Sequence, residues 1–368
     1  MSKKSQSPRA DLGDYMKLCA CTAVMLQTIL GLALTTNPSS DVQTGIGIIY
    51  NFVKFTAPAF IFGILYTTTR TTIDTDLTYP AYMKKQWHAL FVPTIWWTAV
   101  YLFLMPWVQQ VNQYHDIGSF LWHFVNGNAA PHLWYNTMML QFIILMPLFW
   151  LIGRWCGANI RRGILAACGA ILVTALWLWF YDVNIFHGPH MTDWYLFDRF
   201  FLSFFIYGVF GVLAWQYRHF FNGVIQKWWW LIAVVFVGTF VWTNRELLAF
   251  GLPVSLGNAP YYKPSMTVYD LSIIGLIAAL GLFQLRHKMH FTYTVHTFAN
   301  FAYKAYLSNV FWAQILWHIG GQQLMSAHPV IGIVGIYLCT WVLAFASAFG
   351  LHWFWQNIQV RVLKRAVV

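Results

Sequence analysis

The sequence is poor in charge: only 9% of its 368 residues are charged, with 11 Asp and Glu against 22 Lys and Arg. A soluble domain carries about 25% charge, so this composition excludes a soluble fold. Cysteine is scarce too, and most of the five cysteines lie inside apolar runs, where a small buried hydrophobic residue is the ordinary role. The sequence has no HExxH, CxxC, P-loop or GxSxG motif, and we expect no metal site.

Long apolar runs make up most of the chain, which is 59% hydrophobic and 19% aromatic. A membrane span needs about 20 apolar residues. By that rule the sequence predicts an all-α, polytopic transmembrane bundle of about ten helices, near residues 15–35, 46–67, 88–108, 132–153, 163–182, 194–215, 228–245, 267–285, 300–319 and 330–355.

Basic residues indicate how the chain crosses the membrane. Lys and Arg gather at both termini and in alternate loops, so the positive-inside rule places both termini in the cytoplasm. The net charge of +11 is thereby explained as a topology signal, and nucleic acid is not expected as a partner. We predict a basic tail at 1–14 with no cleaved signal peptide, one transmembrane domain at 15–356 and a second basic tail at 357–368.

Ionisable groups are costly inside a membrane, so each one in an apolar run is a candidate site residue. Lys54 stands about eight residues inside the predicted helix 46–67, roughly 12 Å deep, and is expected to face the bundle interior. Asp198 and Arg199 lie about one turn inside the predicted helix 194–215. Such groups gather in the outer half of the bundle, which indicates a water-accessible cavity opening outward. The predicted substrate-binding residues are Gln27, Trp134, Tyr135, Asn136, Asp198, Asp270 and Asn309.

Two alternatives stand beside this interpretation. The polar groups of the spans can instead form interhelical hydrogen bonds and one structural ion pair. Lys84 and Lys85, just before the predicted helix 88–108, can be simple topology charges, or they can meet anionic headgroups or an anionic donor. Between Gln109 and Pro131, the stretch SFLWHFV is too brief to span and predicts a short interfacial helix.

Several stretches resemble the acyltransferase-3 family of integral membrane acyltransferases, in particular its intercellular-adhesin-C-like members. PHLWYNTMMLQFIILMPLF is similar to the family's helix with an HLW–aromatic start, a Gln–aromatic pair and a Pro–Leu end. YMKKQWHALFVPTIWWTAVYLF resembles the basic-led helix with an internal proline, and NFVKFTAPAFIFGILY the helix with a Pro–aromatic pair. FANFAYKAYLSNVFWAQIL occupies the place of the late helix with a Tyr–Leu core.

The resemblance implies a fold of about ten helices and O-acylation of a surface polysaccharide or lipid-linked glycan with an acetyl- or succinyl-type group. It also implies acyl-CoA as donor substrate, no bound cofactor, and a bacterial plasma membrane. Family members carry an Arg in helix one and a His about eleven positions later; here Lys17 takes the place of the Arg, and Gln27 and Thr28 that of the His. Gln86 replaces a usual Arg, and the late His is absent, since Asn309 stands there.

If acyl transfer survives these changes, the base must come from elsewhere, because a Gln cannot accept and return a proton near neutral pH. His132 is the predicted base, while Lys54 and Arg199 would stabilise an oxyanion or hold an anionic group. Lys84 and Lys85 would attract the donor's phosphates. The competing functions are a non-catalytic export or assembly component of the same scaffold, and an unrelated small-molecule transporter.

Overall fold

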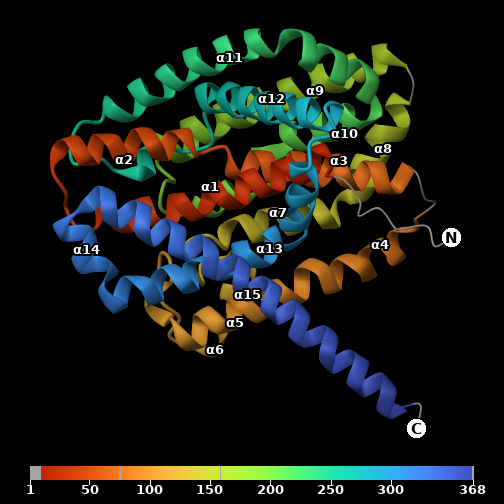
Figure 1. The fold of residues 1–368 in the computed structure, drawn as a ribbon. Coiled ribbons are helices and arrows are strands. Elements are labelled where there is room, and N and C mark those ends of the chain that lie inside the picture. The colour runs from red at the N-terminus through yellow and green to blue at the C-terminus, as the bar shows by residue number, and fades with distance from the viewer. Residues whose placement is uncertain (1–9, 74–76, 158, 367–368) are drawn as a thin grey trace.

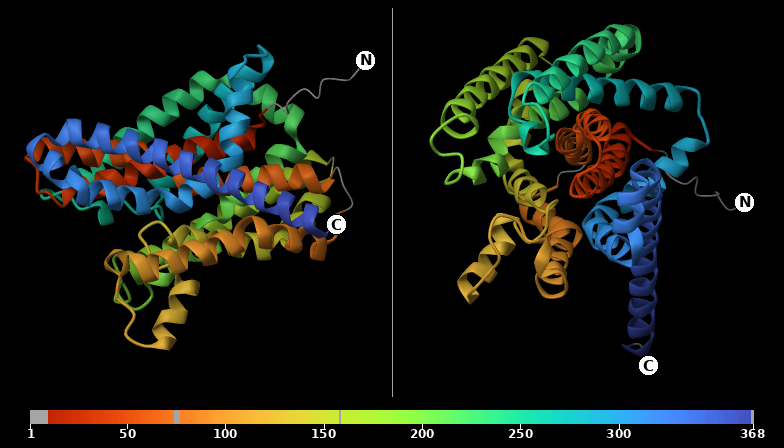
Figure 2. Two further views of the ribbon diagram at one scale, coloured as in Figure 1. Left: turned by 60° about the horizontal axis from the view of Figure 1, so that its bottom comes forward. Right: turned by 90° about the vertical axis from the view of Figure 1, so that its left-hand side faces the viewer.

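The computed structural model describes residues 10–73, 77–157 and 159–366, and every regular element in these ranges is a helix. The helices pack into one bundle (Figures 1 and 2), which confirms the predicted all-α transmembrane bundle. The α-helices are α1 (Leu12–Leu34), α2 (Ser40–Phe52), α3 (Thr56–Ile73), α4 (Tyr79–Gln86), α5 (Val92–Leu104), α6 (Ile117–Asn126), α7 (Trp134–Ile144), α8 (Met146–Cys156), α9 (Ile160–Tyr181), α10 (Phe205–Gln216), α11 (Arg218–Leu248), α12 (Pro264–Arg286), α13 (Phe291–Leu316), α14 (Gln322–Ala327) and α15 (Pro329–Ala366).

Short π- and 3₁₀-helical turns join or extend these helices. The π-helical ones are η1 (Trp87–Phe91), η3 (Asp182–Phe186) and η7 (Trp317–Gly321). The 3₁₀ turns are η2 (Pro106–Val108), η4 (Tyr195–Arg199), η5 (Phe201–Phe204) and η6 (Leu256–Asn258).

Seven helices of the described residues are long and apolar enough to cross a membrane, or up to eight if the bent pair α7–α8 is one span. The segment Ser40–Thr72 counts as one of these spans although it contains both α2 and α3, and α4 continues through η1 into α5 as another. The apolar helix Phe201–Gln216, which contains α10, is shorter than these candidate spans. The protein is therefore a multi-pass membrane protein, and the count of ten spans stays a prediction.

Several predicted boundaries differ from the structure: α11 and α13 begin about ten and nine residues before the predicted helices 228–245 and 300–319, and the predicted helix 132–153 is divided into α7 and α8. The predicted helix 194–215 begins instead with the 3₁₀ turns η4 and η5, and the α-helix starts only at Phe205. Helix α15 continues to Ala366, where the sequence predicted a tail from residue 357. Residues 1–9 of the predicted N-terminal tail and the last two residues of the C-terminal one lie outside the described residues.

Helix α1 forms the centre of the bundle, where it packs against α3, α12, α13 and α15. Figure 2 shows α1 and α3 surrounded by the other helices when the bundle is viewed end-on. Helices α9 and α11 lie farther out, and α11 packs mainly on α12. The apolar stretches of the sequence thus divide into a buried centre and an outer layer that would meet lipid.

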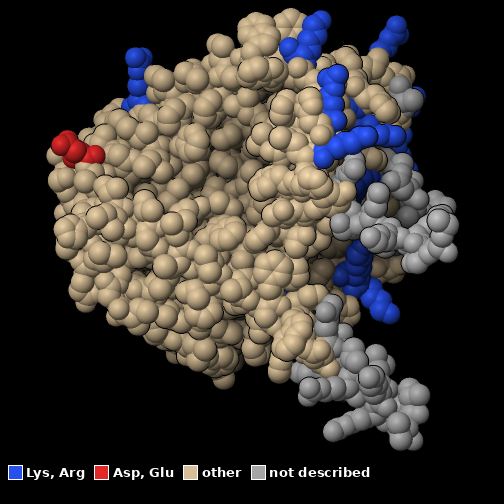
Figure 3. Space-filling model, in the orientation of Figure 1, with Lys and Arg blue, Asp and Glu red and all other residues tan. Residues whose placement is uncertain are grey.

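The two ends of the bundle differ in charge. Figure 3 shows that most Lys and Arg side chains on the visible face gather toward the end where α1 begins and α15 finishes. At this basic end, Asp11 forms an ion pair with Arg70 at 2.8 Å, and the Asp14 carboxyl lies within hydrogen-bond distance of His296 Nδ1, at 2.7 Å. These pairs tie α1 to α3 and α13. That the basic end is cytoplasmic stays a prediction of the positive-inside rule.

Helices α1 and α3 cross so closely that glycine is required at the contact. A Cβ atom on Gly63 would lie 2.9 Å from the Cβ of Met16 and 3.2 Å from the carbonyl oxygen of Gly13. A Cβ on Gly13 would in turn strike Thr67 and the Gly63 carbonyl. Small residues let the backbones of membrane helices approach in this way, so the central helix pair depends on these glycines.

Gly63→Ala is expected to lower stability by about 1–3 kcal/mol, because the added methyl group overpacks the α1–α3 contact. Gly31→Ala is the matched control: nothing lies within 4 Å of a Cβ there, and replacing a helical glycine raises stability by about 0.5–1 kcal/mol. Thermal denaturation in detergent measures both. Equal shifts for the two variants would show that the crossing is not tight.

Candidate functional site

The span that contains α2 and α3 is interrupted at residues 53–55, and the interruption carries Lys54. Two side chains accommodate the backbone there: the Gln27 amide donates a hydrogen bond to the Val53 carbonyl at 2.9 Å, and the Tyr269 hydroxyl donates one to the Phe52 carbonyl at 2.7 Å. An apolar medium offers no other partner for such carbonyl groups. The break therefore persists because neighbouring helices hold it.

Aromatic rings, rather than a carboxylate, surround the Lys54 ammonium. The side chain is 7% exposed, and its Nζ lies 4.3 Å from the ring centre of Tyr261, 4.7 Å from that of Tyr50 and 3.1 Å from the Tyr50 hydroxyl. The ion pairs of Lys and Arg within the described residues all involve other side chains. Within the described residues, the direct contacts of the Lys54 ammonium are thus π faces and a hydroxyl, and the buried carboxyl of Asp270 interacts with it electrostatically from farther away.

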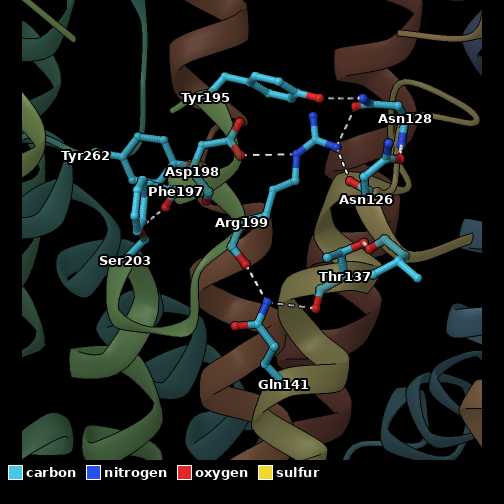
Figure 4. A network of polar contacts seen from close by, with 11 residues as sticks. Asn126, Asn128, Thr137, Gln141, Tyr195, Phe197, Asp198, Arg199, Ser203 and Tyr262 are labelled. Carbon is cyan, nitrogen blue, oxygen red and sulfur yellow. Dashed lines mark hydrogen bonds and ion pairs between the residues drawn. The ribbon is translucent and has the colours of Figure 1, made fainter. Parts of the chain in front are cut away.

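A second cation, Arg199, is fixed by a polar network drawn in Figure 4. Its guanidinium donates to the Asn126 carbonyl and, at 2.6 Å, to the side-chain oxygen of Asn128; its Nε lies 3.1 Å from Asp198. The amide of Asn128 donates to the Tyr195 hydroxyl at 2.9 Å. Arg199 is 7% exposed, so its direction is set by the residues after α6 and by its neighbour Asp198.

Gln141 on α7 forms hydrogen bonds with the backbone of the same segment, next to Arg199. Its amide nitrogen donates to the Arg199 carbonyl at 2.7 Å, and its side-chain oxygen accepts from the Phe201 N–H at 3.1 Å. These two backbone groups stand at the junction of η4 and η5, where no helical partner is available. The Gln of the PHLWYNTMMLQF stretch is therefore a structural clamp for the turn that presents Arg199.

Lys54 and Arg199 border one cavity, of about 410 Å³, at the end of the bundle opposite the basic end; we call it the far-end cavity. Its other walls are mainly aromatic and polar. The lining residues are Gln27, Tyr50, Lys54, Gln110, Gly127, Pro131, Trp134, Tyr181, Ile185, Phe186, Met191, Tyr195, Asp198, Arg199, Leu256, Gly257, Ala259, Pro260, Tyr261 and Tyr262. Two cations face one carboxylate among them, so the cavity is suited to an anionic or strongly polar ligand.

The structure brings five of the predicted site residues together around the far-end cavity, and they come from four different segments of the chain. They are Gln27, Lys54, Trp134, Asp198 and Arg199. The residues that the sequence reasoning missed are Asn128 in the network and the tyrosines of the wall. Those tyrosines lie near helix ends, where an interfacial aromatic belt explains them equally well, so the sequence carried no separate signal for them.

His132 is not among the residues that line this cavity, contrary to the expectation that it would face it. The side chain is 4% exposed and sits between the rings of Tyr101 and Tyr306, whose centres lie 5.3 and 5.0 Å away. Its Nε2 is 3.3 Å from the Leu307 carbonyl, while Nδ1 has no partner among the described residues. Its neighbours Pro131 and Trp134 reach the cavity instead.

The remaining predicted substrate-binding residues are also buried behind the cavity. Tyr135 packs against the Phe60 ring at 5.3 Å; Asn309 accepts a hydrogen bond from Thr28 at 3.1 Å; Asp270 accepts one from Tyr207 at 3.1 Å. Asn136 is 1% exposed. Apart from Asn136, whose side chain has no hydrogen-bond partner in the described ranges, these contacts fit the alternative of interhelical packing and hydrogen bonding.

A second cavity, of about 700 Å³, lies at the basic end beside the bend between α7 and α8. Its polar lining includes Thr69, Tyr79, Arg154 and Gln216. Lys84 and Lys85 do not line this cavity, and both are exposed at the end of α4. The two cavities stand at opposite ends of the bent pair α7–α8, which contributes Trp134 to one and Pro147 and Trp150 to the other.

The Asp198 side chain is partly exposed, and the pKa of its carboxyl differs from the ordinary value. It lies in η4, ahead of the apolar helix that begins at Phe201, and its side chain is 27% exposed. Partial burial raises the pKa of the carboxyl to about 6, although Arg199 opposes the shift. The carboxylate is therefore in a range where it can gain and lose a proton near neutral pH.

These features define a class: a helical membrane bundle with a cationic, aromatic-walled cavity at one end. The family model described as an acyltransferase domain, that of the acyltransferase-3 family, matches residues 14–349. The chain therefore belongs to the acyltransferase-3 family, as its sequence resemblance predicted, and the family implies a membrane acyltransferase. No curated protein and no solved structure matches the chain.

Gln141→Leu is expected to lower stability by about 2 kcal/mol, because the Arg199 carbonyl and the Phe201 N–H lose their partner. Thermal denaturation in detergent measures the change. Gln226→Leu, at an exposed position of α11, is the control and should change stability by less than about 0.5 kcal/mol. A Gln141 variant as stable as this control would contradict the clamp.

Proposed function

We propose that the protein is an integral membrane O-acyltransferase that moves an acetyl- or succinyl-type group onto a hydroxyl of a cell-surface polysaccharide or lipid-linked glycan. Family membership supports the acyl transfer, and the far-end cavity supports the acceptor site. The aromatic walls offer flat faces for sugar rings, and a few fixed polar groups orient them, as in other small-molecule sites. In the predicted orientation, the far-end cavity would open on the outer side of the membrane, which we propose to be a bacterial plasma membrane.

The observation that carries the proposal is the position of Lys54. A buried ammonium that forms no ion pair within the described residues is a functional-site candidate by default inside a membrane. During acyl transfer the acceptor oxygen attacks the acyl carbonyl carbon, and negative charge develops on the carbonyl oxygen. A preorganised cation beside that oxygen stabilises the transition state more than the ground state. We assign this role to Lys54, and to Arg199 the positioning of Asp198.

The acceptor hydroxyl must also lose a proton, and two residues are candidates for the base. His132 was the candidate from the sequence, but its ring is buried behind the cavity wall, and this burial lowers the pKa of its imidazole to about 3. Asp198 lines the cavity, and its carboxylate is held by Arg199 at 3.1 Å. A base must lie within hydrogen-bond reach of the proton it removes. Geometry therefore favours Asp198.

We propose that the donor is acyl-CoA, taken up at the basic end rather than bound as a resident cofactor. Arg154 lines the cavity there and carries a charge opposite to that of the donor's phosphates. The exposed Lys84 and Lys85 would raise the local concentration of an anionic donor without contacting it in the cavity. Transfer then requires the acyl group, still joined to CoA as its thioester, to reach the far-end cavity. The acceptor oxygen forms the new ester bond there, the C–S bond breaks, and CoA leaves as its thiol with the proton taken from the acceptor hydroxyl.

Lys54→Met is expected to lower kcat/KM for transfer of a radiolabelled acetyl group to glycan by about 10²–10³-fold, the usual cost of removing one oxyanion-stabilising group. Lys54→Arg, which keeps the charge but changes its position, should retain part of the activity. The assay uses purified protein in proteoliposomes with labelled acetyl-CoA. Wild-type rates in Lys54→Met would contradict the catalytic assignment, and absence of transfer by the wild type would favour an export or assembly role.

The base can be identified from the pH dependence of the same assay. With Asp198 as base, the rate should rise as pH increases through about 6, because only the carboxylate form accepts a proton. Asp198→Asn should remove this step and lower kcat by about 10²–10⁴-fold, the usual contribution of a positioned base. His132→Gln should keep both rate and pH profile. The opposite pattern would identify His132.

A further inference from the structure

Helix α9 presents one side to a long groove rather than to a neighbouring helix. Its residues that face the groove recur every three or four positions from one end to the other, and they are Ile160, Gly163, Ile164, Ala167, Ile171, Thr174, Ala175, Leu178 and Trp179. The helix has 22 residues and is therefore about 33 Å long. That length matches the hydrocarbon thickness of a bilayer, about 30 Å.

The groove consists of two cavities placed end to end, of about 590 and 880 Å³. Both cavities are lined by α9, α10, α11 and α12, and Val268 and Leu271 of α12 belong to both. The walls of the first cavity are almost entirely aliphatic and aromatic. Since the three long helices around it are candidate membrane spans, the groove runs through the depth of the membrane. Water is therefore an unsuitable occupant and a hydrocarbon chain a suitable one.

The groove opens toward the lipid. Ile171, Trp179 and Val268, which line it, are 51, 67 and 42% exposed. An exposed apolar side chain on a membrane-spanning helix is solvated by acyl chains, so a lipid can enter the groove sideways, without crossing a polar barrier.

At the far end of the bundle the groove becomes polar. Lys263 and Glu246 form an ion pair at 2.6 Å there, and Nδ1 of His187 lies within hydrogen-bond distance of the Asp182 carboxyl, at 2.8 Å. Two aromatic residues at this mouth, Phe186 and Tyr262, also line the far-end cavity that holds Lys54. The apolar groove and the proposed acceptor site thus lie side by side, with these two side chains as a shared wall.

We propose that the groove binds the hydrocarbon chain of a lipid-anchored acceptor, a polyprenyl-phosphate-type glycolipid, while its head group passes Tyr262 into the far-end cavity. The proposal rests on the proposed function and specifies its substrate class. Charge complementarity supports it: Lys54 and Arg199 outnumber the single carboxylate of that cavity, Asp198, which suits the phosphate of such a lipid. The anchor would deliver the sugar to the site in the plane of the membrane.

Photolabelling tests the groove without requiring acyl transfer. Wild-type protein in phosphatidylcholine nanodiscs is irradiated with a polyprenyl phosphate that carries a diazirine on its chain, and labelled peptides are identified by mass spectrometry. Label is expected on peptides from α9 and α12. Ala167→Trp and Ala175→Trp should each lower it by about tenfold, because an indole fills the space of the chain. Leu172→Trp, on the side of α9 away from the groove, should leave it unchanged.

Several results would overturn the proposal. The first is equal labelling of Ala175→Trp and wild type, and the second is label spread evenly over all outer helices. The third is that phosphatidylglycerol competes with the labelled polyprenyl phosphate as well as unlabelled polyprenyl phosphate does, which would make the groove a general lipid site. Recovery of the groove residues crosslinked to another membrane protein would also overturn it.

A transfer assay separates the groove proposal from the proposed function of the enzyme. Selective labelling of the groove without any acyl transfer refutes only the proposed function. Transfer to a lipid-anchored glycan that is unaffected by Ala175→Trp refutes only the groove.

Discussion

Satisfaction of backbone hydrogen bonds in an apolar surrounding is the constraint on which this structure depends. A helix that crosses a bilayer can be interrupted only where other groups replace its lost hydrogen bonds. Both interruptions at the candidate site meet this condition through glutamine: Gln27 holds the break before α3, and Gln141 holds the turn before α10. Without these two amides, the Val53 and Arg199 carbonyl groups and the Phe201 N–H would lose these hydrogen bonds in an apolar surrounding.

The two helix interruptions explain the positions of Lys54 and Arg199. Lys54 follows the last turn of α2, and Arg199 ends the 3₁₀ turn η4, so neither side chain leaves from the regular surface of a helix. Each points into the space that the interrupted backbone vacates, and the two meet in one cavity. An ammonium ion beside tyrosine rings and a guanidinium held by amide oxygens are both costly to desolvate. Their cost is offset by Tyr50 and Tyr261 at Lys54, and by Asn126, Asn128 and Asp198 at Arg199.

The sequence predicted the fold class well, because helix length and apolar content follow directly from bilayer thickness. It also identified Lys54 and Arg199, since a charge in an apolar run is conspicuous. It did not show that Tyr101 and Tyr306 enclose the ring of His132, because a place at the start of a helix does not reveal these neighbours; the role of His132 as base stays a prediction. It also missed the 3₁₀ turns before α10: FDRFFLSFF reads as helical by composition, and only the contacts to Gln141 and Asn128 from a distant segment show otherwise.

The structure gives a physical account of Gln27, one of the residues that differ from the family pattern. Where family members carry a histidine in helix one, this chain has Gln27, whose amide is engaged with the break at Val53 and whose oxygen lies 3.5 Å from the Thr56 hydroxyl. A histidine at that place could serve as a base, whereas the glutamine orders the backbone next to Lys54. The loss of one proton acceptor thus coincides with a second candidate, the carboxylate of Asp198, on the same cavity wall. Chemistry of the family type requires a base, a cation for the oxyanion and a bound hydroxyl; it does not require that the base come from helix one.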